Sequence, residues 1–220
     1  MSYALRDGLS FCAVEDRLLF LDRPADRYFC LAHAAERAVA RLYHGQDLDP
    51  SDRARLAGLA RTGLLIDRDG ADHIAPCPAP PLAACSLLDS APSRSRAGEL
   101  AVALLHLSLA RLELQLFGFG RTIARAERRK HRLRVRAGHE RVATVAAAFQ
   151  GAAGLISEHD RCLPRSVALA HRLMRIGAAP DLVIAVKLGP FKAHAWVQCG
   201  DALINERVEI ARLFTPILVL

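Results

Sequence analysis

The chain has 220 residues, of which 52% are hydrophobic and 24% are charged, with a formal net charge of +7 at pH 7. This composition excludes a disordered or fibrous protein and leaves room for one large or two small domains. The six cysteines form no C-x-x-C pair, and the N-terminal residues lack the apolar segment of a signal peptide. We therefore expect reduced thiols in a cytoplasmic protein.

Residues 1–76 show the pattern of a small unit in which strands come first and helices follow. The expected strands cover 3–5, 9–14, 17–22, 27–31 and 64–66, and the expected helices cover 32–43 and the stretch from Asp49-Pro50 to Gly63. Asp69-Gly70 predicts a hairpin that leads to His73-Ile74. Strands followed by helices and then by a small wing are the layout of a winged helix.

A winged helix can bind DNA, and the second helix offers Arg53, Arg55 and Arg61 for that purpose. Six aspartates between residues 47 and 72 surround these arginines and would repel a phosphate backbone. We therefore expect no nucleic acid as a partner.

A proline-rich stretch predicts a linker over 77–98, followed by a second domain over 99–220. The second domain begins with helices over 99–116, 122–132 and 138–149. The apolar run 100–109 is interrupted by Arg111 and Glu113 and falls short of the ~18 clean residues of a membrane span, so we expect no membrane contact. The segment 121–141 carries nine Arg or Lys against two Glu. It is either a solvated face or a docking surface for an acidic partner or an acidic stretch of substrate.

Cys162 stands at the start of the next predicted helix. Pro164 suits a first helical turn, apolar residues then recur at helical spacing, and Gly177 is a plausible stop. The free N–H groups and dipole of a helix N-terminus favour a thiolate, and Arg161 and Arg165 add positive charge. The sequence therefore predicts a reactive cysteine at this position.

His194 lies in the second of two predicted strands, 182–186 and 193–198. Trp196 shares its face and would shield the imidazole from water. A histidine that follows a cysteine at a helix start is typical of a nucleophile and its base. A zinc site from Cys162, His194 and Cys199 is the alternative, but structural zinc usually brings close-spaced ligand pairs, so we expect no metal and no other cofactor.

The group that orients His194 depends on the loop after Cys199. A two-residue Gly200-Asp201 turn would place His194 opposite Arg207, whereas a three-residue loop would place it opposite Glu206. Three-residue hairpins with a glycine are common, so we predict Glu206, with Asn205 as the alternative because papain-type triads use an amide.

The motifs Cys162-Leu-Pro-Arg-Ser-Val-Ala-Leu-Ala170, His194-Ala-Trp-Val-Gln198 and Leu203-Ile-Asn-Glu206 resemble the lasso-peptide maturation protease, a transglutaminase-like cysteine peptidase often called the B protein. In that family the third catalytic residue is usually Asp, twelve positions after the His, where this chain has Glu206. The resemblance implies cleavage of a ribosomal precursor peptide after its leader. It also implies a partner, an asparagine-synthetase-like lasso cyclase, which closes the macrolactam.

The motifs Arg17–Asp22, Asp26–Leu31 and Gly63-Leu-Leu65 resemble the RiPP recognition element, a winged-helix module that binds leader peptides. In that family the leader adds as a strand to a sheet edge and packs on the last helix. By position, the implied leader-binding residues are Arg27, Tyr28 and Phe29 on the edge strand and Leu56, Leu59 and Ala60 on the helix. The fold class implied for the whole chain is α+β, a winged-helix recognition element followed by a papain/transglutaminase-like cysteine protease domain.

Two other functions use the same residues. An amine could replace water as the acyl acceptor, which would make the chain a transglutaminase-type acyl transferase. With an inactive triad, the chain would be a non-catalytic adaptor that binds a peptide or DNA.

Overall fold

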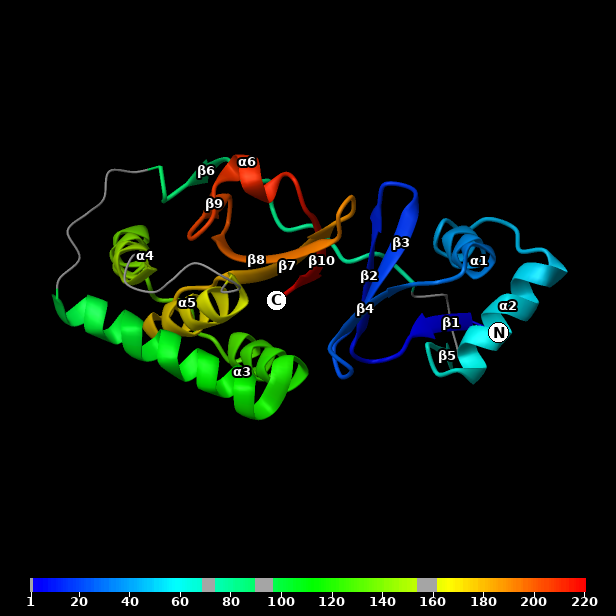
Figure 1. Ribbon diagram of the computed structural model, residues 1–220, viewed down its shortest axis with the longest axis horizontal. Coiled ribbons are helices and arrows are strands. Elements are labelled where there is room, and N and C mark those ends of the chain that lie inside the picture. Colours follow the sequence, from blue (N-terminus) through cyan, green and yellow to red (C-terminus); the bar gives the residue numbers. More distant parts are fainter. Residues whose placement is uncertain (1, 69–73, 90–96, 154–161) are drawn as a thin grey trace. The chain divides into compact units, whose positions relative to one another are not determined.

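The computed structural model describes residues 2–68, 74–89, 97–153 and 162–220. The chain divides into two compact units, Met1–Pro78 and Ala79–Leu220, which are described separately below. Figure 1 shows that the first unit contains β1 to β5 with α1 and α2, and that the second contains the remaining elements.

The N-terminal unit contains a three-stranded antiparallel sheet in the order β2 (Leu9–Val14), β3 (Arg17–Asp22) and β4 (Arg27–Cys30). Separately, β1 (Ser2–Leu5) pairs antiparallel with β5 (Leu65–Arg68). The strand expected to begin a wing therefore pairs with the first strand of the chain. The predicted Asp69-Gly70 hairpin lies outside the described residues.

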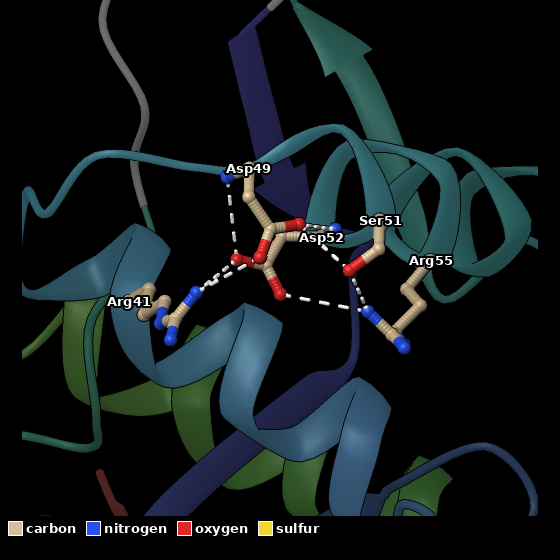
Figure 2. A network of polar contacts seen from close by, with 5 residues as sticks. All are labelled: Arg41, Asp49, Ser51, Asp52 and Arg55. Carbon is tan, nitrogen blue, oxygen red and sulfur yellow. Dashed lines mark hydrogen bonds and ion pairs between the residues drawn. The ribbon is translucent and has the colours of Figure 1, made fainter.

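The two helices of this unit are α1 (His33–Tyr43), which contacts β3, and α2 (Pro50–Arg61), which contacts α1 and β5. They share a core that includes Phe11, Phe20 and Leu56. A capping box starts α2, because Asp49 accepts from the N–H of Asp52 while Asp52 accepts from the N–H of Asp49. Figure 2 shows that Arg41 of α1 reaches the same carboxylates, at 2.6 Å from Asp52.

The polar network in Figure 2 also bears on the DNA-binding interpretation of this unit. Arg55 donates to Ser51 at 2.6 Å and lies 3.7 Å from the carboxylate of Asp52. One of the three arginines considered for DNA contact is thus engaged in holding the start of α2.

The C-terminal unit is built on a five-stranded sheet in the order β10-β7-β8-β9-β6. Its strands are β6 (Cys85–Ser86), β7 (Asp181–Lys187), β8 (Lys192–Cys199), β9 (Ala202–Leu203) and β10 (Thr215–Val219). β6 joins β9 in parallel, whereas the other pairs are antiparallel. The segment expected to be a linker therefore contains a strand of this unit.

Helices cover this sheet in two layers (Figure 1). α5 (Cys162–Ile176) contacts β7 and β8, and α3 (Ala97–His131) and α4 (His139–Ala153) pack against α5. The short α6 (Val208–Ala211) follows β9. Gly118, with φ 73°, breaks α3 into two helical segments, as the sequence predicted for this region.

α3 is also the one described helix that is long and apolar enough to cross a membrane by composition, with 22% of its apolar window buried. Part of this window packs on the rest of the unit, since Ala103, Leu107 and Ala110 are buried. By itself, this composition is weak evidence for a membrane segment.

Candidate active site

Cys162 is the first residue of α5, as the sequence predicted. The helix ends in a Schellman motif: Gly177, at φ 87°, donates to the carbonyl of Met174, and Ala178 donates to the carbonyl of Leu173. Between these ends, residues 166–171 are all buried. The helix therefore holds the Cys162 backbone firmly against the sheet, at the end where free N–H groups point.

His194 lies in β8, opposite Ala185 of β7. Its Nε2 is 2.5 Å from Oε2 of Glu206, so Nδ1 is the ring nitrogen that remains for the Cys162 thiol. The rings of Trp196 and Phe214 lie 6.1 and 5.1 Å from the imidazole, measured between centroids. The imidazole thus sits between a thiol and a carboxylate, with aromatic rings beside it.

The register argument that led to Glu206 was wrong, although the residue it selected is the one that contacts His194. β8 pairs with β9 through Cys199 opposite Ala202, which is the two-residue turn. Continued along the strand, this register would bring Arg207 opposite His194. β9 ends at Leu203, however, and the chain bends away from the sheet, which lets Glu206 reach the imidazole.

Two contacts hold Glu206 after this bend. Ser86 of β6 donates to the Glu206 carbonyl at 2.7 Å, and the N–H of Arg207 donates to Oε1 of the Glu206 carboxylate at 2.8 Å. One carboxylate oxygen is therefore fixed by the backbone while the other faces His194. The position of Glu206 depends on a strand that the sequence placed in the linker.

A buried polar network that the sequence analysis missed joins the segments that carry the three residues. Ser166 donates to the Ala195 carbonyl at 2.9 Å, and Asn205 donates to Ser166 at 3.0 Å. Oδ1 of Asn205 accepts from the N–H of Val197 at 2.7 Å. Ser166 lies one turn after Cys162, Ala195 follows His194, and Asn205 precedes Glu206. Asn205 thus ties α5, β8 and the bend together, and its amide is engaged away from His194.

The ionisation of the three groups is strongly coupled. Burial raises the pKa of Cys162. The hydrogen bond and charge of His194 and the backbone N–H groups of Ala195 and Leu163 lower this pKa by a larger amount, so the net shift is downward from 9.0. Burial lowers the pKa of His194, but Cys162 and Glu206 raise it to about 9. Burial raises the pKa of Glu206, but the hydrogen bond to His194 outweighs this effect, so the pKa of Glu206 is lowered. These directions favour a thiolate–imidazolium pair backed by a carboxylate.

A family model named for the transglutaminase-like superfamily matches residues 103–219, which is more than half of the chain. The chain belongs to the transglutaminase-like superfamily. This domain fits a superfamily of cysteine peptidases and acyltransferases, and the matched residues include Cys162, His194 and Glu206. No curated protein and no solved structure matches the chain.

Arg165 adds positive charge inside the transglutaminase-like unit. It lies three residues after Cys162, on the same side of α5. Burial lowers the pKa of Arg165 while the charge of Glu206 raises it, and Arg165 in turn helps to lower the pKa of Glu206. Its Nε is buried without a hydrogen-bond partner among the described residues. Arg161, predicted to share this role, lies outside the described residues.

The alternative zinc ligands of this unit do not converge. His194 and Cys199 are five residues apart in β8, an odd spacing that directs their side chains to opposite faces of the sheet. Burial also raises the pKa of Cys199 to about 11, which disfavours the thiolate that a metal would need.

The candidate leader-binding residues of the N-terminal unit differ in exposure. Arg27 is exposed, and its guanidinium lies 5.4 Å from the ring centroid of Phe29. The Phe29 ring stacks on Phe20 and therefore faces the core. Tyr28 is half-buried on the other face of β4. On the helix, Leu59 and Ala60 are half-buried, whereas Leu56 is 0% exposed and offers no surface to a peptide.

Proposed function

We propose that this chain is a cysteine peptidase that binds the leader of a ribosomal lasso-peptide precursor and cleaves it from the core peptide. The observation that carries the proposal is the line of Cys162, His194 and Glu206, in which a thiol at a helix start is backed by an imidazole and a carboxylate. The superfamily match supports thiol chemistry of this kind. The leader and the lasso precursor come from the sequence resemblance.

In the proposed reaction, the Cys162 thiolate attacks the carbonyl carbon of the scissile peptide bond. His194, protonated through its contact with Cys162, gives its proton to the leaving amine of the core peptide, and the leader remains as a thioester on Cys162. A water molecule, deprotonated by His194, then attacks the thioester and releases the leader carboxylate. Glu206 holds the imidazole in the required tautomer and stabilises its positive charge throughout.

The N-terminal unit would recognise the leader by strand addition. Within the described residues β4 has a strand partner on one side only, whereas the outer edge of β2 receives the N–H of Cys77 at Phe11, at 2.7 Å. This difference makes β4, which carries Arg27 and Tyr28, the better edge for an added strand. Tethering the leader there would raise the local concentration of the cleavage site.

The proposal also places the chain in the cytoplasm beside an asparagine-synthetase-like cyclase. The cyclase would consume the freed N-terminus of the core peptide, which is the product of the cleavage step. Cleavage and ring closure are therefore consecutive reactions on one precursor.

Incubation with a leader-bearing precursor peptide from the same gene neighbourhood, with and without the cyclase, tests the proposal by mass spectrometry. We expect an intact leader in both cases, with a core that has a free N-terminus when the cyclase is absent, and both products lost in Cys162→Ala. A product in which the leader carboxyl is joined to an added amine would identify an acyl transferase, which the same superfamily accommodates. A precursor that binds but stays whole under every condition would make the chain a carrier.

A further inference from the structure

The basic segment of the chain forms one wall of a large open groove in the C-terminal unit. The groove has a volume of about 960 Å³ and lies between the two segments of α3, the residues that follow α3, and the C-terminal end of α5. Met174 lines it from α5, and Gly177 lines it just after the helix ends. His171 is the groove residue of α5 nearest to Cys162, and nine residues of helix, ~13.5 Å at 1.5 Å per residue, separate the two, so the groove is distinct from the candidate active site.

The floor of the groove is an exposed seam of leucines on the first segment of α3. Leu109, Leu112 and Leu116 line it, with 49, 49 and 64% of their surface exposed, and Leu105, 57% exposed, continues the seam along the helix. Their spacing of four, three and four residues is the spacing of a coiled-coil seam. Such a seam accepts one further helix laid along it.

The walls of the groove are basic. Arg125, Arg128 and Arg129 recur at helical spacing on the second segment of α3, so they share one face of it, and Arg132 follows directly after the helix. Arg134, Arg136 and Arg175 complete the wall, and Glu113 is the only carboxylate among the described lining residues. The positive charge is therefore concentrated beside an apolar floor.

Two pairs of contacts give the groove a fixed shape. Arg125 lies 3.9 Å from the ring centroid of Phe117 and 3.3 Å from the carboxylate of Glu113, which joins the two segments of α3 across the break at Gly118. Arg136 and Ala137 donate to the Gly177 carbonyl at 2.8 and 3.1 Å, which fixes the basic stretch on the end of α5. The groove is thus held by contacts within one unit.

The inner wall carries two histidines that remain neutral at pH 7. Burial, and then the charge of Arg129, lowers the pKa of His171 to about 4, and burial likewise lowers the pKa of His106. Nε2 of His171 is buried with no hydrogen-bond partner among the described residues. Among the described lining residues, the positive charge of the groove therefore comes from arginines.

We propose that this groove docks an acidic amphipathic helix of a partner protein. The apolar seam matches the leucine stripe of such a helix, and the arginines match carboxylates on its flanks. An anionic membrane fits less well, because three of the four leucines line a groove rather than a protruding face.

The test is fluorescence polarisation of the full chain with a labelled synthetic helix of about three heptads, carrying leucine at a and d and glutamate on both flanks. We expect saturable binding, weakened about tenfold or more by Arg128→Glu with Arg132→Glu, and similarly by Leu109→Ser with Leu112→Ser. The matched control is Arg212→Glu with Leu213→Ser, an exposed pair outside the groove, which should bind as the unaltered chain does. A helix with lysine in place of glutamate should not bind.

Absence of saturable binding up to roughly 100 μM would overturn the proposal. Equal loss in the control pair, or equal binding of the lysine helix, would do the same. Tighter binding to vesicles of anionic phospholipid or to random duplex DNA, dependent on the same arginines, would assign the groove to a membrane or to nucleic acid. A dimer in sedimentation that the leucine variants dissociate would assign it to a second copy. Because the readout is binding, none of these results depends on whether Cys162 is catalytic.

Discussion

The two ends of α5 carry different kinds of surface, although one helix supports both. At the N-terminal end, Cys162 is half-buried and its neighbours His194 and Glu206 are held by hydrogen bonds to one another and to the backbone. At the C-terminal end, Met174 and Gly177 line an open groove with exposed leucines and seven arginines. The N-terminal end therefore carries half-buried groups of both charges, and the C-terminal end carries an open, strongly basic groove.

This difference shows how the same scaffold suits two tasks. Shifted pKa values require groups that are withdrawn from water and in fixed contact, which the Ser166–Asn205 network provides. Docking of another chain requires apolar surface and charge that water reaches until the partner arrives. Substitutions at the N-terminal end should therefore alter chemistry, and substitutions at the C-terminal end should alter binding or stability.

The largest effect should come from His194→Ala. We expect peptidase activity on the precursor to fall on the order of 10⁴-fold, because the thiolate loses its partner and the leaving amine loses its acid. The pKa of Cys162 should rise, since the hydrogen bond and charge of His194 lower it. The pH dependence of iodoacetamide alkylation, with Cys162→Ala as the blank, measures this shift. His131→Ala, at an exposed position, is the matched control, and an unchanged alkylation profile in His194→Ala would contradict the pairing.

Glu206→Gln should have the next largest effect, a loss of about 10²-fold in activity with little change in stability. Glu206 helps to raise the pKa of His194 to about 9, so activity should decline near pH 9 as the imidazolium loses its proton. Without the carboxylate, the pKa of His194 falls and the alkaline limb of the pH profile moves to lower pH. Glu209→Gln, exposed in α6, should leave the profile unchanged. An alkaline limb that stays in place would remove Glu206 from the role given to it.

Asn205→Ala should act through stability. It leaves the buried N–H of Val197 and the hydroxyl of Ser166 without their partner, which costs about 2–3 kcal/mol of unfolding free energy. Urea denaturation followed by circular dichroism measures this loss, with the exposed turn variant Asp201→Ala as control. If Asn205→Ala instead abolished activity without lowering stability, Asn205 would be the third catalytic residue after all.

Gly177→Ala should have the smallest effect, about 1–2 kcal/mol of unfolding free energy, and should spare the thiol. Gly177 has φ 87°, and a Cβ there would lie 3.2 Å from Cβ of Arg136 and 3.3 Å from its backbone nitrogen. Gly98→Ala is the control, because nothing lies within 4 Å of its added Cβ and its φ is ordinary. A changed alkylation profile for Cys162 in Gly177→Ala would show that the two ends of α5 are not independent.

Local sequence signals determined much of this protein. The start of α5 at Cys162, its end at Gly177, the His194 strand and the cap of α2 at Asp49 all follow from residues a few positions apart. These signals are short-range because capping, glycine stops and apolar periodicity act within one or two turns. The thiol and the imidazole could therefore be predicted together from the sequence.

Only the tertiary structure decided how Glu206 comes into contact with His194. The β8–β9 register alone would place Arg207 opposite His194. Glu206 reaches His194 instead because β9 ends at Leu203 and the Asn205 side chain accepts the hydrogen bond from the N–H of Val197. The same holds for β6, which was expected in a linker but supports Glu206, and for Leu56, whose helical spacing did not reveal its complete burial. The leucine seam and the arginines also become one groove only when α3 folds back at Gly118 and packs on α5. These features depend on contacts between residues that are distant in sequence, and no local pattern encodes them.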